Sequence, residues 1–350
     1  MGNSDNYFIN RDDANLLKIR EIRKELPHFC AEFFRGIEQD TTPLTRLGYA
    51  RDLKLFFNFL VNEVEEFYQK PVLSLDYPDL EKITSTHLEM FMEYISLYKD
   101  NGKTYRNGEK AKARKLSSVR AMLKYFFKKN TIISNVAEKV DTPKIRTGEI
   151  IRLEYDEIAK LLNISETGER MTKMEQGFHK HTRIRDYAML SLFLGTGIRI
   201  SECVGLNIDD LDFSQNAFKI TRKGGSKVIL YFNDEVSDAL QAYLYERNAN
   251  KNVPPTEKAL FLSLQNRRIS VRAVEKLVKK YTSYVTPLKK ITPHKLRSTF
   301  GTNLYKETKD IYIVADVLGH KDVNTTRKHY AAISDDIRRE AATKVKFRKD

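Results

Sequence analysis

Several cationic side chains in the second half of the chain have the types and spacing needed to act on a phosphate group. Arg199 follows Gly195 and Gly197 at a predicted helix start. Backbone N–H groups and the helix dipole attract an anion at such a position. Glu202 lies one helical turn further on, where its carboxylate would orient the Arg199 guanidinium.

Two further motifs follow toward the end of the chain. His294 and Arg297 are three residues apart on a predicted helix and would share one face of it. The sequence Leu318-Gly319-His320 ends the next predicted helix, and Tyr330 stands ten residues after His320 as the only later tyrosine. Each motif alone is common, because a His–Arg pair on a helix is ordinarily a surface pair and a lone tyrosine is ordinarily in the core. Their combination and order carry the information.

The chain lacks the sequence features of nucleotide-driven or metal-dependent phosphoryl transfer. It has no Walker A sequence and no paired carboxylates like those of two-metal nucleases. His179 and His181 lie in a polar stretch that we expect to be an exposed loop rather than a metal site. We therefore expect no cofactor and no metal. A phosphoryl-transfer enzyme without a metal must neutralise charge with its own cations.

The net charge of +14 is concentrated in two blocks. Residues 101–150 hold 13 Lys and Arg against 4 Asp and Glu, and residues 251–300 hold 12 against 2. The remaining residues up to 250 are acidic or balanced, with 12 against 18 in residues 1–100 and 13 against 15 in residues 151–250. Two such blocks indicate a protein that binds a polyanion from two sides, because neutralising phosphates releases counterions and so favours binding. Two solvated faces would explain the same counts.

The first 140 residues have helical periodicity. Thr84 and Ser85 offer caps to the first of two amphipathic segments. The apolar faces of these segments consist of Leu88, Phe91, Met92 and Ile95, and of Leu116, Val119, Leu123, Phe126 and Phe127. The aromatic residues predicted to pack in the core are Tyr49, Phe56, Phe57 and Phe59.

The polar stretch 141–152 contains Pro143 and Gly148 and lacks periodicity, which is typical of a linker. Beyond it, the sequence predicts a buried helix over Arg183–Leu194, a hairpin of Ala217–Thr221 and Lys227–Tyr231 with a basic tip, and an amphipathic helix around 271–281. We therefore expect domains at 1–142 and 153–350 with a linker at 143–152, and a mainly α fold with a small antiparallel β-sheet.

This ordered set of residues resembles the catalytic set of the tyrosine recombinase family, also called phage integrases. Lys223 at the hairpin tip stands 24 residues after Arg199, and His320 stands 23 after Arg297, as in the Xer-type members. Those members usually place the tyrosine nine residues after the histidine, where this chain has ten. The segments that are more loosely similar to the XerS branch are Thr221–Gly225, Ala259–Ser263 and Lys24–Pro27.

The resemblance implies a role for each catalytic position. Tyr330 would be the nucleophile and His294 its general base. Arg199, Arg297 and His320 would bind the scissile phosphate, and Lys223 would be the general acid. It also implies a helical, SAM-like core-binding domain before the catalytic one, and a chain that cleaves and rejoins DNA through a 3′-phosphotyrosine.

The implied partner is a double-stranded DNA recombination site, bound by a homotetramer that holds two sites. A DNA translocase is the accessory partner that a Xer-type role implies. The residues expected to contact DNA are Arg114, Lys115, Arg120, Lys124, Lys128, Arg267, Arg268, Arg272 and Lys276. Beyond Tyr330, an apolar stripe from Ala332 to Val345 would pack either on a neighbouring protomer or on its own domain.

Other features bound the biological role. There is no apolar run long enough to span a membrane and no signal peptide, and the only cysteines are Cys30 and Cys203, so we expect a cytoplasmic, nucleoid-associated protein. Chromosome dimer resolution is the expected role. The alternatives are an integrase of a mobile element, a type IB topoisomerase and an inactive DNA-binding regulator.

Overall fold

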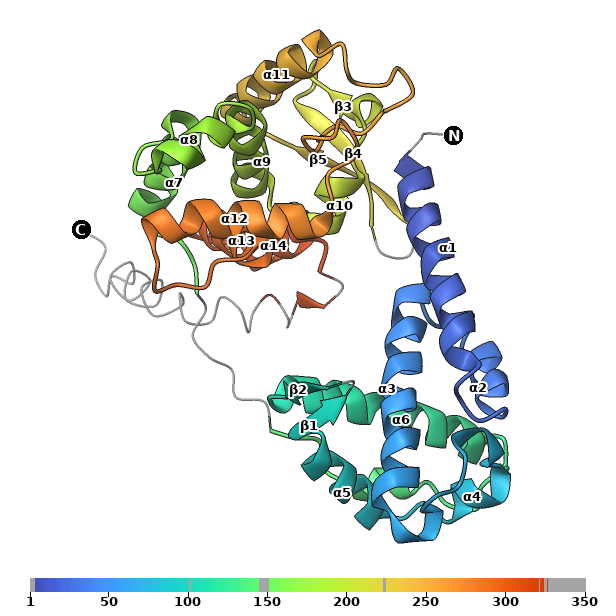
Figure 1. The fold of residues 1–350 in the computed structure, drawn as a ribbon. Coiled ribbons are helices and arrows are strands. Elements are labelled where there is room, and N and C mark those ends of the chain that lie inside the picture. The colour runs from blue at the N-terminus through green and yellow to red at the C-terminus, as the bar shows by residue number, and fades with distance from the viewer. Residues whose placement is uncertain are drawn as a thin grey trace, which may run out of the picture. The chain divides into compact units, whose positions relative to one another are not determined.

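The structure, a computed structural model, describes residues 4–100, 102–144, 151–222, 225–320, 322, 323 and 326. The packing divides the chain into two compact units, residues 8–148 and, as far as they are described, residues 149–350 with residues 1–7 (Figure 1). Each unit has its own apolar core. Within the described ranges, no helix is both long and apolar enough to cross a membrane.

The unit of residues 8–148 is mainly helical. Its helices are α1 (Ser4–Arg23), whose first residues belong to the other unit, α2 (Cys30–Gly36), α3 (Pro43–Glu63), α4 (Tyr77–Glu81), α5 (Ser85–Tyr94) and α6 (Glu109–Lys128), with 3₁₀ turns at Glu65–Phe67, Val72–Ser74 and Val136–Lys139. Thr84 caps α5 as predicted, because its hydroxyl accepts a hydrogen bond from the His87 amide at 3.2 Å.

The core of this unit forms where α3, α5 and α6 pack against one another. The predicted aromatic residues Phe56, Phe57 and Phe59 are buried there, and Tyr49 is half-buried. The prediction for Phe127 is wrong, because its side chain is 41% exposed on α6 while Phe126 beside it is fully buried. Successive residues on a helix point about 100° apart, and on α6 this turn carries the Phe127 side chain out of the core.

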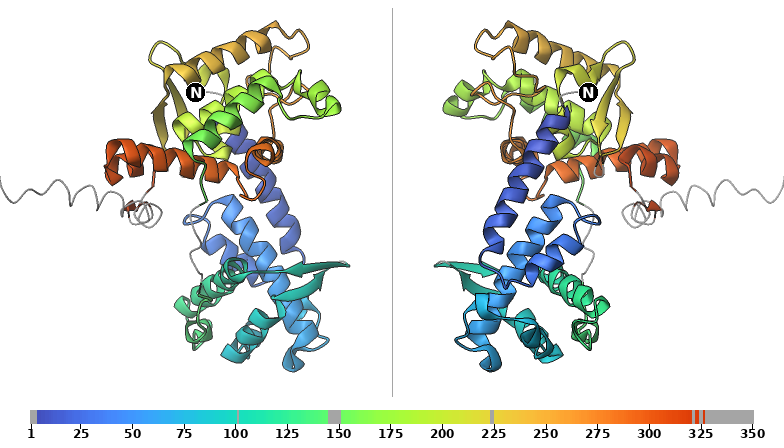
Figure 2. Two further views of the ribbon diagram at one scale, coloured as in Figure 1. Left: turned by 90° about the vertical axis from the view of Figure 1, so that its left-hand side faces the viewer. Right: turned by 90° about the vertical axis from the view of Figure 1, so that its right-hand side faces the viewer.

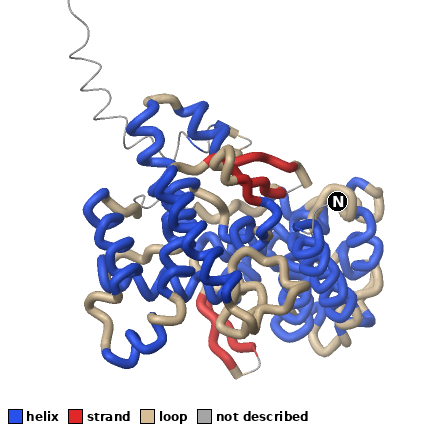
Figure 3. The backbone as a smooth tube through the Cα atoms, turned by 90° about the horizontal axis from the view of Figure 1, so that it is seen from above, coloured by secondary structure: helices blue, strands red, loops and turns tan. Residues whose placement is uncertain are grey.

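A two-stranded ribbon that the sequence analysis missed joins α5 to α6. Its antiparallel strands are β1 (Leu97–Asp100) and β2 (Lys103–Arg106). Tyr98 and Tyr105 lie opposite each other with their rings stacked 5.2 Å apart. The ribbon projects from the helices of its unit (Figure 2) and is one of two small sheets among the described residues (Figure 3).

The unit of residues 149–350 combines helices with a three-stranded sheet. The predicted hairpin is present with the predicted bounds, and a two-residue strand that was not predicted adds to it. The elements are α7 (Tyr155–Thr167), α8 (Lys173–His179), α9 (Arg183–Thr196), α10 (Ile200–Gly205), a 3₁₀ turn at Ile208–Asp210, β3 (Leu211–Asp212), β4 (Ala217–Thr221), β5 (Lys227–Tyr231), α11 (Asp234–Ala249), α12 (Val271–Val285), α13 (Pro293–Thr308) and α14 (Ile311–Leu318).

Helix α9 is the central element of this unit. Its residues 188–193 are all buried and, except for Ser191, apolar, and the helix contacts α7, α11 and α13 (Figure 1). A helical stretch of this kind must be buried. It ends at Gly197, whose φ of 61° is left-handed, and α10 follows at once. The core helix therefore fixes the positions of α10 and α13, which carry Arg199 and Arg297.

The histidine pair in the predicted loop requires a correction. His179 is not exposed: it is the last residue of α8, only 3% of it is accessible, and its Nε2 lies 2.9 Å from the Ser165 carbonyl oxygen. His181 is exposed as expected. The polar residues around His179 hid a short helix whose last turn packs inward.

Cys30 and Cys203 are both free and buried, and burial raises the pKa of both thiols.

Candidate active site

Arg199 is held at the start of α10 by one carboxylate. Its backbone N–H donates to Glu202 Oε2 at 2.9 Å and its Nη1 donates to Glu202 Oε1 at 2.8 Å. Glu202 is only 5% exposed, whereas 37% of the Arg199 side chain is accessible to solvent. The predicted orienting role of Glu202 therefore has the geometry it requires.

The turn before Arg199 needs glycine for two reasons. Gly197 has a positive φ, and a Cβ there would lie 2.4 Å from the Phe300 ring. Its carbonyl oxygen also accepts a hydrogen bond of 2.5 Å from Arg297 Nη1. The turn that leads to one arginine thus positions the other.

Arg199 and Arg297 converge on the C-terminus of α14. Arg297, which is only 4% exposed, donates through Nη2 to the Leu318 carbonyl. Arg199 Nη2 lies 3.3 Å from the same oxygen and 3.1 Å from that of Gly319. These terminal carbonyls carry the partial negative charge of the helix end. Two guanidinium groups from distant parts of the sequence therefore share one acceptor.

The two predicted histidines lie on the elements that carry this cluster. His320 follows Gly319, the left-handed cap of α14, and its Nδ1 lies 2.7 Å from the Thr326 hydroxyl. His294 lies in the first turn of α13 and is exposed, one turn before the buried Arg297. Lys223 and Tyr330 lie outside the described residues, as does the stripe from Ala332 to Val345. The structure thus brings together Arg199, Glu202, Arg297 and His320.

Arg222 is a third guanidinium at this helix end, and the sequence analysis did not single it out. Its Nη2 donates to the Val317 carbonyl at 2.8 Å. Burial lowers the pKa of Arg222, and the charge of Arg199 adds to this effect while Glu202 and Asp316 oppose it. The available signal was an arginine beside the lysine of a predicted hairpin tip.

The residues expected to contact DNA fall into two groups. Those with exposed side chains are Arg114, Lys124, Lys128, Arg267, Arg272 and Lys276. Of these, Arg114 also pairs through Nη1 with buried Asp52 at 2.5 Å. The other three are turned toward the protein. Lys115 is buried and donates to Asn107 at 3.1 Å, and burial lowers its pKa. Arg120 donates to the Ala137 carbonyl at 3.1 Å, and Arg268 donates to those of Val204 and Leu206.

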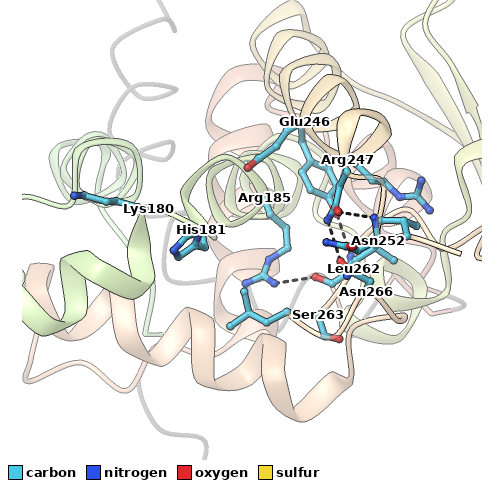
Figure 4. Close-up of a pocket in the computed structure, with 13 residues that line it drawn as sticks. Lys180, His181, Arg185, Glu246, Arg247, Asn252, Leu262, Ser263 and Asn266 are labelled. Atoms are coloured by element: carbon cyan, nitrogen blue, oxygen red, sulfur yellow. Dashed lines mark hydrogen bonds between the residues drawn. The ribbon is translucent and has the colours of Figure 1, made fainter.

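A cavity of about 400 Å³ lies elsewhere in the same unit (Figure 4). Lys180, His181 and Arg185 line one side of it. Arg185 donates to the Leu262 carbonyl at 2.8 Å and pairs with buried Asp186 at 2.6 Å, so its charge serves the fold. None of the predicted site residues lines this cavity. Among the residues that the structure describes, no group of three or more His, Cys, Asp and Glu could hold a metal ion.

Comparison with known proteins identifies the class of this fold and site. A model described as the phage integrase family matches residues 145–336, more than half of the chain. Tyrosine recombinase XerC of Caldanaerobacter subterraneus subsp. tengcongensis is 33% identical over 344 residues, which cover 97% of this chain and 91% of the relative. Tyrosine recombinase XerS of Streptococcus thermophilus is 27% identical over 348 residues, covering 92% and 96%.

The fold is shared with solved recombinases. XerH bound to a palindromic difH substrate, in a post-cleavage complex, has a TM-score of 0.64 at 18% identity and covers 87% of this chain and 81% of its own. The Tn1549 transposon integrase in complex with transposon right end DNA has a TM-score of 0.60 at 20% identity, covering 89% and 99%.

The chain belongs to the phage integrase family. It is a tyrosine recombinase, an enzyme that cleaves and rejoins DNA at specific sites, and DNA is its partner. The predicted family and fold class are confirmed.

Proposed function

We propose that Tyr330 attacks the scissile phosphate, which Arg199 and Arg297 hold. The observation that supports this proposal is the convergence of both guanidinium groups on the Leu318 carbonyl. Donors that are already gathered and oriented stabilise developing negative charge without reorganising. Each planar guanidinium can also donate two parallel hydrogen bonds to two phosphate oxygens, which a lysine could not do.

The remaining catalytic residues move protons or stabilise charge. His294 accepts the proton of the Tyr330 hydroxyl, because the ordinary tyrosine pKa of about 10 makes this group a poor nucleophile at neutral pH. The tyrosine oxygen bonds to phosphorus, and the bond from phosphorus to the 5′ oxygen breaks. Lys223 donates a proton to that oxygen, and His320 donates a hydrogen bond to the phosphate.

The products of the first step are a 3′-phosphotyrosine and a free 5′-hydroxyl. The covalent link retains the phosphodiester energy, so the 5′-hydroxyl of a partner strand reverses the step and completes the exchange without ATP. Two duplexes require four active sites, and we therefore propose a homotetramer on two sites. The cations of this chain supply the charge neutralisation, with no metal or cofactor in the reaction.

The helical unit and the catalytic unit both bind the duplex in this proposal. We assign phosphate contacts to the exposed residues Lys124 and Lys128 on α6, and Arg272 and Lys276 on α12. Their side chains are accessible and carry the excess charge of the two basic blocks. The proposed domains are residues 1–142 for core binding and 153–350 for catalysis.

We further propose chromosome dimer resolution as the biological role, with a DNA translocase as accessory partner. Identity of 33% to a XerC across 97% of this chain supports this role. A genome-wide map of binding sites tests it directly. We expect one chromosomal site that is not bounded by a mobile element. Sites at the two ends of an element would instead identify an element integrase.

The reaction itself is tested with two copies of the mapped site on one plasmid. We expect purified protein to exchange the sites in EDTA without nucleotide. Relaxation of supercoils without exchange would indicate a type IB topoisomerase, and a strict need for Mg²⁺ would contradict the proposed mechanism. Binding without any strand cleavage would indicate a regulator.

A further inference from the structure

Arg222 connects the β4–β5 hairpin to the end of α14 through its side chain. Besides the bond to Val317, its guanidinium lies over Gly319, where an added Cβ would be 2.0 Å from Arg222 Nη1. Gly319 has a φ of 62°, which also favours glycine. The glycine before His320 therefore leaves the space that the guanidinium fills.

The backbone of Arg222 closes the turn of the same hairpin. Its N–H donates to the Ser226 carbonyl at 2.8 Å, and its carbonyl accepts from the Gly225 N–H at 3.0 Å. The last ladder pair before the turn joins Thr221 and Lys227. One residue thus joins the hairpin turn to the helix end where Arg199 and Arg297 meet.

The position of Arg222 is costly for folding. Its Nε is buried and has no hydrogen-bond partner among the described residues. Burial of the guanidinium also lowers its pKa, an effect that Glu202 and Asp316 oppose and that Arg199 strengthens. A buried donor without a hydrogen-bond partner costs stability.

We propose that Arg222 is a positioning residue that fixes the hairpin turn against the end of α14, and that the proton transfer proposed for Lys223, the next residue in the chain, depends on this contact. This inference rests on the proposed function, in which Lys223 is the general acid. Arg222 itself is not assigned a contact with DNA. Displacement of a catalytic group by about 1 Å reduces a rate by about 10²-fold, which sets the expected effect.

The test uses single-turnover cleavage of a nicked duplex that carries the mapped site. The duplex is made with either oxygen or sulfur at the bridging 5′ position of the scissile phosphate. A thiolate leaves without protonation, so sulfur bypasses the general acid. The variants are Arg222→Ala, Arg222→Lys, Lys223→Ala and the double variant Arg222→Ala/Lys223→Ala, with Arg199→Ala as the control that sulfur should restore much less.

On ordinary DNA we expect Arg222→Ala to cleave about 10²-fold more slowly with unchanged affinity. Arg222→Lys should recover much of the rate, because an ammonium can still donate to the Val317 carbonyl. The double variant should be no slower than Lys223→Ala, since both changes remove the same proton transfer. On the duplex with sulfur at the bridging position, cleavage by Arg222→Ala and by Lys223→Ala should be restored.

Three results would overturn the inference. If sulfur restores Lys223→Ala but not Arg222→Ala, or if the two losses multiply in the double variant, Arg222 acts independently of Lys223. A wild-type rate for Arg222→Ala would leave it with a purely structural role, which thermal melting would measure. If sulfur does not restore Lys223→Ala, the proposed acid is wrong, and the rate of the double variant on ordinary DNA still decides whether Arg222 acts through Lys223.

Discussion

Two groups of cations, one in each unit, look alike in the sequence but are held in different ways. Arg199, Arg222 and Arg297 come from three separate elements, and their guanidinium groups all bond to carbonyls at the end of α14. Lys124 and Lys128 follow one another along α6 with exposed side chains.

This contrast separates chemistry from affinity. Fixed and partly buried donors stabilise charge in a transition state because they do not reorganise. Exposed lysines along a helix meet a polyanion mainly through counterion release, which any sequence of DNA provides. We therefore expect changes in the first group to affect the cleavage rate, and changes in the second group to affect binding and its salt dependence.

The largest effect should come from Arg199→Lys, which keeps the positive charge but removes the planar guanidinium that can bind two phosphate oxygens. We expect cleavage to slow by on the order of 10²-fold or more, with little change in affinity for the site. Single-turnover cleavage and equilibrium binding measure the two quantities separately. A wild-type cleavage rate would mean that Arg199 serves the fold and not the reaction.

A smaller effect is expected from Arg268→Ala, on folding rather than catalysis. Arg268 donates to the Val204 carbonyl at 2.7 Å and to that of Leu206 at 2.9 Å. Loss of these charged bonds should lower the free energy of unfolding by about 2 kcal/mol. The control is Arg267→Ala, whose exposed side chain should matter by less than about 0.5 kcal/mol. Equal losses in urea denaturation would remove the distinction between the two neighbours.

The smallest effect should come from the double variant Lys124→Ala/Lys128→Ala, and we expect it in the salt dependence of DNA binding. Each phosphate contact contributes about 0.9 to the slope of log affinity against log salt, so the slope should fall by about 2. The matched control is Lys54→Ala/Lys70→Ala in the same unit, because those lysines already pair with Glu25 at 2.6 Å and Asp79 at 2.8 Å. The same decrease in both double variants would mean that α6 has no special role.

The sequence predicted those parts of the fold that depend on local periodicity and turn chemistry. The β4–β5 hairpin and the helices that end at Gly197 and Gly319 follow from apolar spacing and from glycines at the ends. The β1–β2 ribbon could have been predicted as well, because Asn101-Gly102 lies between two four-residue strands and is a strong hairpin signal.

The inward orientation of several cations could not be predicted. Arg120, Arg268 and Lys115 have the same residue types as their exposed neighbours, and their partners are backbone or amide oxygens brought near only by folding. The shared acceptor of Arg199 and Arg297 is likewise long-range, since Leu318 lies 119 residues after Arg199. The sequence singled out Arg199 and Arg297 but not the helix end on which they meet.

Tyr330 is the residue proposed to form the covalent bond to DNA, and a nicked substrate tests this role most directly. On such a duplex the cleaved strand diffuses away, so the wild-type protein accumulates as a covalent adduct that denaturing electrophoresis resolves. Tyr330→Phe lacks only the hydroxyl and should bind the duplex as tightly as the wild-type protein while forming no adduct. An adduct of wild-type yield in this variant would contradict the assignment and place the nucleophile on another residue.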